Sequence, residues 1–402
     1  MRAYLDHAAT TPLLSPARDA VLAAMERTGN ASSLHTSGRA ARRLLEESRE
    51  SLAASLGVTP SEVILTSGGT EADNLAVKGL WWSRTGADPR RRRVIASRVE
   101  HHAVLDPVVW LAEHEGAEVV WLDVDRYGVV DVEQLRTELA AGPAVALAAV
   151  MWANNEVGTV QPIDLVAQAC AEHGVPLHVD AVQAFGSVAL DSTVPATLAV
   201  SAHKLGGPMG VGALVARRGI GLTPLAHGGG QERQVRSGTP DVPTAAGFAA
   251  AAAHVVGQLP ERGRRLSALR DGLLARVLEV DPSARVNGAT GGPEVRLPGN
   301  AHVSFPGCEG DALLMLLDAA GVDVSTGSAC SAGVPEPSHV LLAMGVDPVL
   351  ARSSLRFTLG ATSTASDVDA LIAALPAALD RSRRAGQLRT TRRLAGTRAE
   401  GA

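Results

Sequence analysis

The sequence of 402 residues contains few aromatic residues, few lysines and few cysteines. Aromatic side chains make up 3% of it, which disfavours nucleic-acid binders that stack bases on aromatic platforms. The net charge of −5 lacks the basic excess of a general nucleic-acid binder. No apolar run reaches the roughly 18 residues of a membrane span, and the first residues show no apolar signal-peptide core. We therefore expect a cytoplasmic protein that binds neither nucleic acid nor membranes.

Lysine is scarce, and its two positions restrict the possible chemistry. Of the 37 basic residues, only Lys78 and Lys204 are lysines, and the other 35 are arginines. A genome rich in G and C can produce such a bias without functional meaning. Arginine, however, cannot lose its proton in a protein and so cannot form a Schiff base. Any imine chemistry must therefore use Lys78, Lys204 or the N-terminal amine.

The three cysteines are Cys170, Cys308 and Cys330. An odd, irregularly spaced set is neither a disulfide framework nor a zinc site. Cys170 lies in an apolar helical segment and is expected in the core, and Cys308 lies in a turn where a structural role is favoured. Cys330 lies among small residues in the loop 325–333, which suits an exposed nucleophile that must travel to its target.

Short apolar runs alternate with helical patterns in the first part of the chain. Several runs are continuously apolar, as in strands that are covered on both faces of a sheet. The alternation predicts an α/β fold with a mostly parallel sheet, whose ligands would gather at the carboxyl ends of the strands. The predicted strands are 63–65, 94–96, 119–121, 144–150, 176–179, 197–200 and 212–215, and helices are expected at 71–82, 104–114 and 164–173.

The pattern changes beyond Ala245. An alanine-rich stretch at 249–253 opens a long helical region that reaches Val280. Strands at 301–305 and 355–359 and helices at 311–320 and 365–379 follow, which predicts a smaller α+β domain. The segment 381–402 holds seven arginines and one glutamate. We expect a frayed helix or a disordered tail there, and a contact with an acidic partner remains open.

Two polar residues follow predicted strands at the edge where ligands would gather. Lys204 lies in Ser201–Gly207, between an apolar strand and glycines. Lys204 either pairs with a phosphate or carboxylate group or forms an imine. The scarcity of lysine favours the imine. Asp180 ends the strand 177–180 and could pair with a protonated ring nitrogen, as pyridoxal phosphate requires, or simply cap a helix. Lys78 is expected on a solvated helix face.

Two further segments stand between a strand and a helix. The glycines of Thr66–Glu71 would let backbone N–H groups approach a phosphate. The segment matches neither the dinucleotide-binding nor the P-loop pattern, and a glycine turn with a threonine cap is the alternative.

In Glu100-His101-His102, adjacent histidines could bind a metal, but no other ligand stands at a suitable spacing. No metal is expected, and a histidine here could stack on a ring and move protons.

In their order along the chain, these segments resemble the cysteine desulfurases, which are class V aminotransferases among the fold-type-I pyridoxal-phosphate enzymes. Each motif is weak by itself, whereas the ordered series is specific. The similarity is collinear over nearly the whole chain, from Tyr4 to Phe357. The matching segments are 4–12, 66–74, 100–105, 154–158, 178–183, 201–204, 228–233, 236–239 and 352–357.

The resemblance implies a fold-type-I architecture with two domains. A large cofactor-binding domain with a mostly parallel, seven-stranded sheet would span 15–255. A smaller α+β domain, formed by 1–14 and 256–380, would carry the mobile cysteine loop. The arginine-rich tail would span 381–402.

The resemblance also implies roles for the matching residues. Lys204 would hold pyridoxal 5'-phosphate as a Schiff base and remove the Cα proton of the substrate, and His101 would stack on the ring and assist proton transfer. Cys330, as a thiolate, would attack the substrate sulfur. The other implied contacts are Gly69, Thr70, Ser201, His203 and, from the other subunit of a homodimer, Thr239 at the phosphate; Asp180 at the pyridine nitrogen; Gln183 at the phenolic oxygen; and Asn155 and Arg356 at the substrate carboxylate.

The implied reaction converts L-cysteine to L-alanine and leaves a persulfide on Cys330. The loop around Cys330 resembles that of the subgroup that passes sulfur to protein acceptors, such as iron–sulfur scaffold or tRNA-thiolation proteins. A selenocysteine lyase or a class V aminotransferase on the same scaffold is the alternative, although an aminotransferase needs no mobile thiol. A non-catalytic cofactor-binding regulator would carry a fused DNA-binding module, for which we expect no room before Tyr4.

Overall fold

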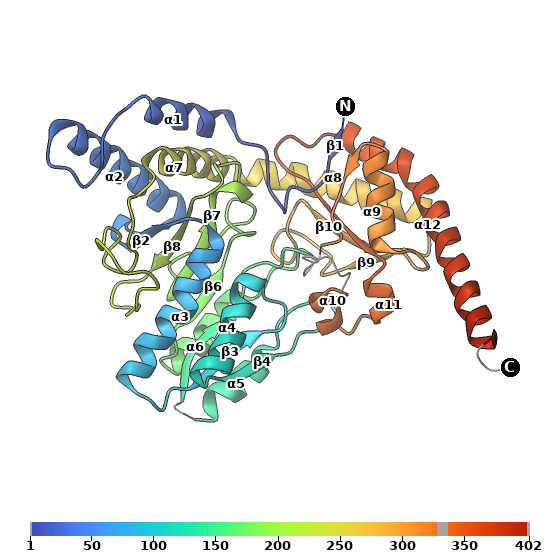
Figure 1. Ribbon diagram of the computed structural model, residues 1–402, viewed down its shortest axis with the longest axis horizontal. Coiled ribbons are helices and arrows are strands. Elements are labelled where there is room, and N and C mark those ends of the chain that lie inside the picture. Colours follow the sequence, from blue (N-terminus) through green and yellow to red (C-terminus); the bar gives the residue numbers. More distant parts are fainter. Residues whose placement is uncertain (1, 143, 328–336, 400–402) are drawn as a thin grey trace.

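The computed structural model describes residues 2–142, 144–327 and 337–399. Figure 1 shows two lobes. The large lobe is built on a seven-stranded sheet with helices on both faces, and the small lobe combines two short sheets with helices.

The central sheet has the strand order β2-β8-β7-β6-β5-β3-β4. β8 is antiparallel to both neighbours, and the other adjacent pairs are parallel, which confirms the mostly parallel sheet. All seven strands that the sequence predicts are present. Their bounds are β2 Val63–Thr66, β3 Arg93–Ser97, β4 Glu118–Leu122, β5 Val145–Ala149, β6 Leu177–Asp180, β7 Thr197–Ser201 and β8 Gly212–Ala216.

Helices cover both faces of this sheet because successive strand residues point to opposite sides. Ile95 and Leu198 pack with α2, α5, α6 and α7 on one face. Their neighbours Val94 and Ala199 pack with α3 and α4 on the other. The bounds are α1 Ser15–Met25, α2 Thr36–Leu56, α3 Gly69–Ala87, α4 His102–Glu115, α5 Val132–Ala140, α6 Ile163–Glu172 and α7 Val242–Gly257, with one-turn 3-10 helices at Pro60–Glu62 and Ala202–Lys204.

The small lobe has a separate hydrophobic cluster, which includes Leu273, Val303 and Phe357. Its sheets are the antiparallel β12-β10-β9 and the parallel pair β1-β11. A further cluster packs Val99 and Met151 of the large lobe against Leu341 of α10, and the exact division into two domains stays a prediction. The bounds are β1 Ala3–Tyr4, α8 Leu259–Val280, β9 Arg285–Asn287, β10 Asn300–Ser304, α9 Gly310–Ala319, β11 Val322–Asp323, α10 His339–Ala343, α11 Pro348–Ala351, β12 Ser354–Thr358 and α12 Ala365–Ala399.

The structure differs from expectation in two helical regions. The long helical region expected up to Val280 is divided into α7 and α8, which meet at 74°. Pro260, in the first turn of α8, has no backbone N–H and therefore opens a new helix instead of continuing the old one. α12 continues through the arginine-rich segment to Ala399 and projects beyond the small lobe in Figure 1. Within the described residues, no single helix is long and apolar enough to cross a membrane; only the bent α7–α8 pair meets that criterion jointly.

Candidate active site

A cavity of about 310 Å³ opens at the carboxyl ends of the central strands. Its walls come from the ends of β6 and β7, from the starts of α3 and α4, and from the small lobe through Ser325, Gly327, His339 and Arg356. Parallel sheets gather their ligands at this edge, and the volume suits a small molecule.

Lys204 ends the 3-10 turn after β7, and its amine meets the N-terminal segment of the chain. Nζ donates to the carbonyl oxygen of Ala8 at 2.7 Å and to that of Ala9 at 2.9 Å. Burial, followed by the charge of Arg356, lowers the pKa of Lys204 to about 8, against the opposing charges of Asp180 and Asp6. A fraction of this amine is therefore neutral near pH 7 and can act as a nucleophile or a base.

Asp180 is the last residue of β6 and is buried at the cavity wall. Its Oδ1 accepts a hydrogen bond from the Val182 N–H at 2.8 Å. Burial raises the pKa of Asp180 to about 6, while the Val182 bond and the charge of Lys204 oppose the rise. The carboxyl is mostly ionised at pH 7 and can pair with a cationic ring nitrogen. Gln183 donates through Nε2 to the Ala8 carbonyl at 2.9 Å.

His101 stands at the start of α4, where its Nδ1 accepts a hydrogen bond from the Ala103 N–H at 3.0 Å. Burial, with a smaller contribution from Lys204, lowers the pKa of His101 to about 4. The ring is therefore neutral at pH 7, and its proton lies on Nε2 because Nδ1 is an acceptor. Such a ring can stack on a heterocycle and exchange a proton through Nε2.

The first residues of α3 and the end of β7 form a site for an anion. Gly69 and Thr70 open α3, whose free N–H groups and dipole favour negative charge. A Cβ at Gly69 would lie 2.7 Å from Val182 Cγ2 and 3.6 Å from the Ser201 Cβ, so this close approach requires glycine. His203 also lines the cavity, and burial is the main cause that lowers its pKa to about 4.

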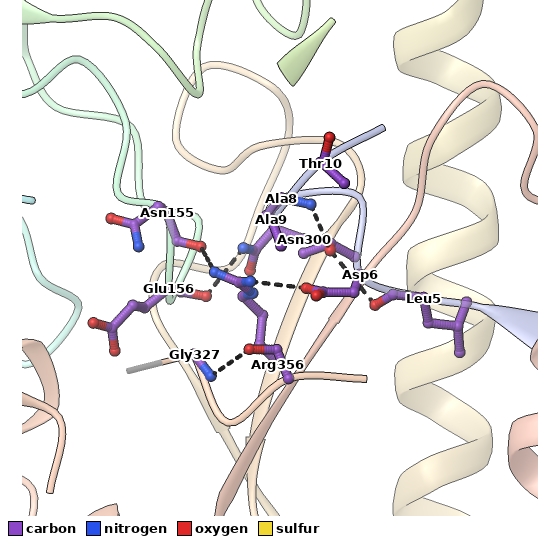
Figure 2. Close-up of polar contacts among 12 residues, drawn as sticks. Leu5, Asp6, Ala8, Ala9, Thr10, Asn155, Glu156, Asn300, Gly327 and Arg356 are labelled. Atoms are coloured by element: carbon purple, nitrogen blue, oxygen red, sulfur yellow. Dashed lines mark hydrogen bonds and ion pairs between the residues drawn. The ribbon is translucent and has the colours of Figure 1, made fainter. Parts of the chain in front are cut away.

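Arg356 reaches the cavity from β12 in the small lobe (Figure 2). One terminal nitrogen donates to the Asn155 carbonyl at 3.0 Å, and the other forms an ion pair with Asp6 Oδ1 at 2.9 Å. The Arg356 side chain is 6% exposed, and its buried Nε has no partner among the residues described. A planar guanidinium fixed in this way can receive a carboxylate.

Every predicted site residue that the structure describes lines this cavity, except Thr239. Thr239 is exposed, and its role in the site of a second subunit stays a prediction. Cys330 lies outside the described residues, whereas Ser325, earlier in the same segment, lines the cavity. Cys170 and Cys308 are both buried, which confirms the core position expected for Cys170, and burial raises the pKa of the Cys170 thiol to about 12.

Comparison with known proteins identifies the family. The family model described as aminotransferase class V matches residues 3–371. A Mycobacterium tuberculosis protein named IscS-like cysteine desulfurase is 57% identical over 386 residues, which cover 95% of this chain and 98% of that protein. The chain belongs to the class V aminotransferases, among the cysteine desulfurases.

Solved structures of similar proteins share the fold. A protein described as NifS-like superposes with a TM-score of 0.86 at 34% identity, over 94% of this chain and 100% of that one. The structure of SspA in complex with cysteine superposes with a TM-score of 0.76 at 31% identity, over 90% of this chain and 100% of that one.

The residues of this desulfurase fit pyridoxal phosphate. The cavity combines an anion site at α3, a lysine amine with a lowered pKa, a buried carboxyl at Asp180 and a neutral imidazole at His101. The Nε of Arg356, which has no partner within residues 2–142, 144–327 and 337–399 as described, adds a donor for the carboxylate of an amino acid. The donor set therefore matches both the phosphate and the ring nitrogen of this cofactor.

The sequence assigned no role to several polar residues that line the cavity, among them Asp73 and His339. Asp73 lies on α3 inside the matching segment 66–74, and its Oδ1 is 3.1 Å from Nε2 of the buried His178. Burial raises the pKa of Asp73 well above the usual range, and the charges of neighbouring carboxyls add to the rise. His339 lines the cavity from α10, and its Nε2 lies 3.0 Å from the Glu100 carbonyl oxygen. No sequence motif marked His339.

Proposed function

We propose that this cysteine desulfurase uses pyridoxal 5'-phosphate to convert L-cysteine to L-alanine and collects the sulfur as a persulfide on Cys330. The position of Lys204 carries the proposal. One of only two lysines in the chain has its amine in the cavity, where its pKa is lowered and the buried Asp180 is near enough to affect it. The cysteine in the solved complex of SspA supports the choice of substrate.

The bound cofactor supplies an electron sink for the Cα of an amino acid. The chain itself holds and orients that group. The anion site at the start of α3 receives the phosphate, and the ionised Asp180 keeps a proton on the ring nitrogen. The proposed contacts are Gly69, Thr70, Ser201 and His203 at the phosphate, Asp180 at the ring nitrogen and Gln183 at the phenolic oxygen.

Two groups move protons in this proposal. Lys204 removes the Cα proton through Nζ, and its lowered pKa makes the neutral amine available for that step. His101 exchanges a proton through Nε2 because the Ala103 N–H occupies its Nδ1. The two groups differ in basicity, since burial keeps the pKa of His101 at about 4 and that of Lys204 at about 8. Lys204 is therefore the stronger base of the two.

Arg356 binds the substrate carboxylate, together with the Asn155 side chain. The contacts of Arg356 with Asp6 and with the Asn155 carbonyl fix the guanidinium before substrate arrives. Preorganisation of this kind lowers the entropy that binding must overcome.

Cys330 receives the sulfur. Its thiolate attacks the sulfur of the substrate, the Cβ–S bond breaks, and an S–S bond forms on Cys330. The carbon skeleton takes up a proton and leaves as alanine. An acceptor protein, such as an iron–sulfur scaffold or a tRNA-thiolation protein, then takes the sulfur from the persulfide.

We also propose a cytoplasmic homodimer in which Thr239 reaches the phosphate of the other subunit. Large apolar side chains are exposed on and beside α1, among them Leu22 at 54%, Met25 at 67% and Met209 at 68%. Leu13 and Met209 line the same surface hollow. Exposed apolar surface of this kind is typical of contacts between subunits.

The proposed reaction is tested with purified protein, L-cysteine, pyridoxal phosphate and a thiol reductant, with alanine and sulfide measured together. We expect equal amounts of the two products. Cys330→Ser should lose both products, whereas Cys308→Ala, a matched change at a buried cysteine, should retain them. Formation of pyruvate and ammonia instead of alanine would contradict the reaction. Unchanged sulfide release by Cys330→Ser would contradict the persulfide step.

A further inference from the structure

A short segment at the start of the chain, residues 4–10, holds the proposed cofactor-binding residues through its backbone. The Ala8 carbonyl accepts from Lys204 Nζ at 2.7 Å and from Gln183 Nε2 at 2.9 Å. The Ala9 carbonyl accepts from the same Lys204 amine at 2.9 Å. Two neighbouring peptide groups therefore fix where the Lys204 amine points.

The same segment also contacts the proposed carboxylate site. Asp6 Oδ1 forms the ion pair with Arg356 at 2.9 Å, as Figure 2 shows. At the other end of the turn, Thr10 Oγ1 lies 3.3 Å from His203 Nδ1. The contacts made by this one turn therefore reach Lys204 and His203, in the 3-10 turn of the large lobe, and Arg356, on β12 of the small lobe.

The phenol of Tyr4 holds the two ends of this turn together. Its hydroxyl lies 2.8 Å from the Thr10 carbonyl oxygen and 3.1 Å from that of Asp6. The ring of Tyr4 packs edge-on against His7 at 5.0 Å between centroids, and β1 anchors the residue to β11. Burial and the charge of Asp6 raise the pKa of Tyr4, so the hydroxyl keeps its hydrogen and stays a donor.

We propose that Tyr4 is a positioning residue and that residues 4–10 form a strap that couples the orientation of the Lys204 amine to that of the Arg356 guanidinium. The inference rests on the proposed function, because it assigns the cofactor to Lys204 and the substrate carboxylate to Arg356. The Ala9 N–H donates to the Asp6 carbonyl oxygen at 3.1 Å, and the Tyr4 hydroxyl contacts the carbonyls at both ends of the turn. A shift of the turn therefore moves the carbonyls of Ala8 and Ala9 together with the backbone of Asp6.

Tyr4→Phe is a sharp test because it removes one hydroxyl and keeps the ring. Tyr127 is the only other tyrosine; it is exposed on a turn outside the cavity, which makes Tyr127→Phe a matched control. Four quantities are measured in both variants: the rate at which pyridoxal phosphate attaches to the apoprotein, the dissociation constant of the cofactor, KM against kcat for L-cysteine, and the melting temperature.

For Tyr4→Phe we expect slower cofactor attachment and a higher KM for L-cysteine, each by about threefold to tenfold, as for the loss of one hydrogen bond. Tyr127→Phe should change neither quantity. Asp6→Asn, a second variant, should raise KM more than it slows attachment, because Asp6 contacts Arg356 directly and reaches Lys204 only through the backbone. A purely structural role for Tyr4 would lower the melting temperature alone.

Two results would overturn the proposal that residues 4–10 couple Lys204 to Arg356. One is a Tyr4→Phe protein that matches Tyr127→Phe in both attachment rate and KM. The other is a change in only one of the two quantities, which would show that the cofactor and carboxylate sites are not coupled. Failure of the proposed function is distinct, because the unmodified protein would then bind no pyridoxal phosphate or release no alanine from L-cysteine.

Discussion

The two lysines of the chain lie in contrasting surroundings. Lys204 ends the turn after β7, where the carbonyls of Ala8 and Ala9 hold its amine and burial lowers its pKa to about 8. Lys78 lies on α3 with Nζ 3.9 Å from the centre of the Trp110 ring, which is a cation–π contact. The amine of one lysine therefore lies in the cavity, and the amine of the other packs on an aromatic ring outside it. Position in the fold, and not residue type, decides the chemistry.

Lys204→Arg is the change that should break this contrast most completely. Arginine keeps the positive charge but cannot deprotonate or attach the cofactor covalently. We expect sulfide and alanine formation to fall by on the order of a thousandfold or more, the range for loss of a positioned base. Both products are measured after incubation with L-cysteine and pyridoxal phosphate.

Lys78→Arg is the matched control for that experiment and should keep full activity, because arginine also forms cation–π contacts. Borohydride reduction followed by peptide mapping adds an independent check. A pyridoxyl group on Lys78 of the unmodified protein would reverse the assignment of the two lysines.

The pH dependence of cofactor attachment tests the lowered pKa of Lys204. The neutral amine is the reactive form, and a pKa of about 8 for Lys204 leaves a minority of it neutral at pH 7. We expect the attachment rate to rise about tenfold from pH 7 to pH 9 and then to level off. Stopped-flow absorbance of the apoprotein with pyridoxal phosphate measures the rate. A rate that keeps climbing beyond pH 10 would show that the amine is not perturbed.

Local sequence pattern was enough to predict that Asp180 and Lys204 would line one cavity at the edge of the sheet. Apolar runs place β6 and β7 inside the sheet, and parallel strands end at one edge, so Asp180 and Lys204 had to lie near each other. The elimination of arginine as an imine former then left few candidates for the attachment site. The long helical region up to Val280 is helical in the structure, but its periodicity does not show the 74° break between α7 and α8.

The contacts that orient the site were beyond prediction from local pattern. The bonds from Lys204 to the carbonyls of Ala8 and Ala9 join positions nearly two hundred residues apart and involve no side chain of the acceptors. The pairing of Asp6 with Arg356 likewise depends on the bridge that joins Asp6 to Thr358, the last residue of β12. Such pairs follow from tertiary packing, on which helix and strand periods carry no information.

Lys78→Met should have the smallest effect, and it tests whether Lys78 contributes to stability without taking part in the reaction. Methionine keeps an apolar stem but removes the cation over Trp110, so we expect a loss of about 0.5–1 kcal/mol in the free energy of unfolding. Urea unfolding should show a lower midpoint with an unchanged slope, since the folded surface is the same. Sulfide release should remain at the level of the unmodified protein, because Lys78 does not line the cavity. A marked loss of activity without a loss of stability would mean that the two lysines are functionally linked through α3, whose first turn lines the proposed phosphate site.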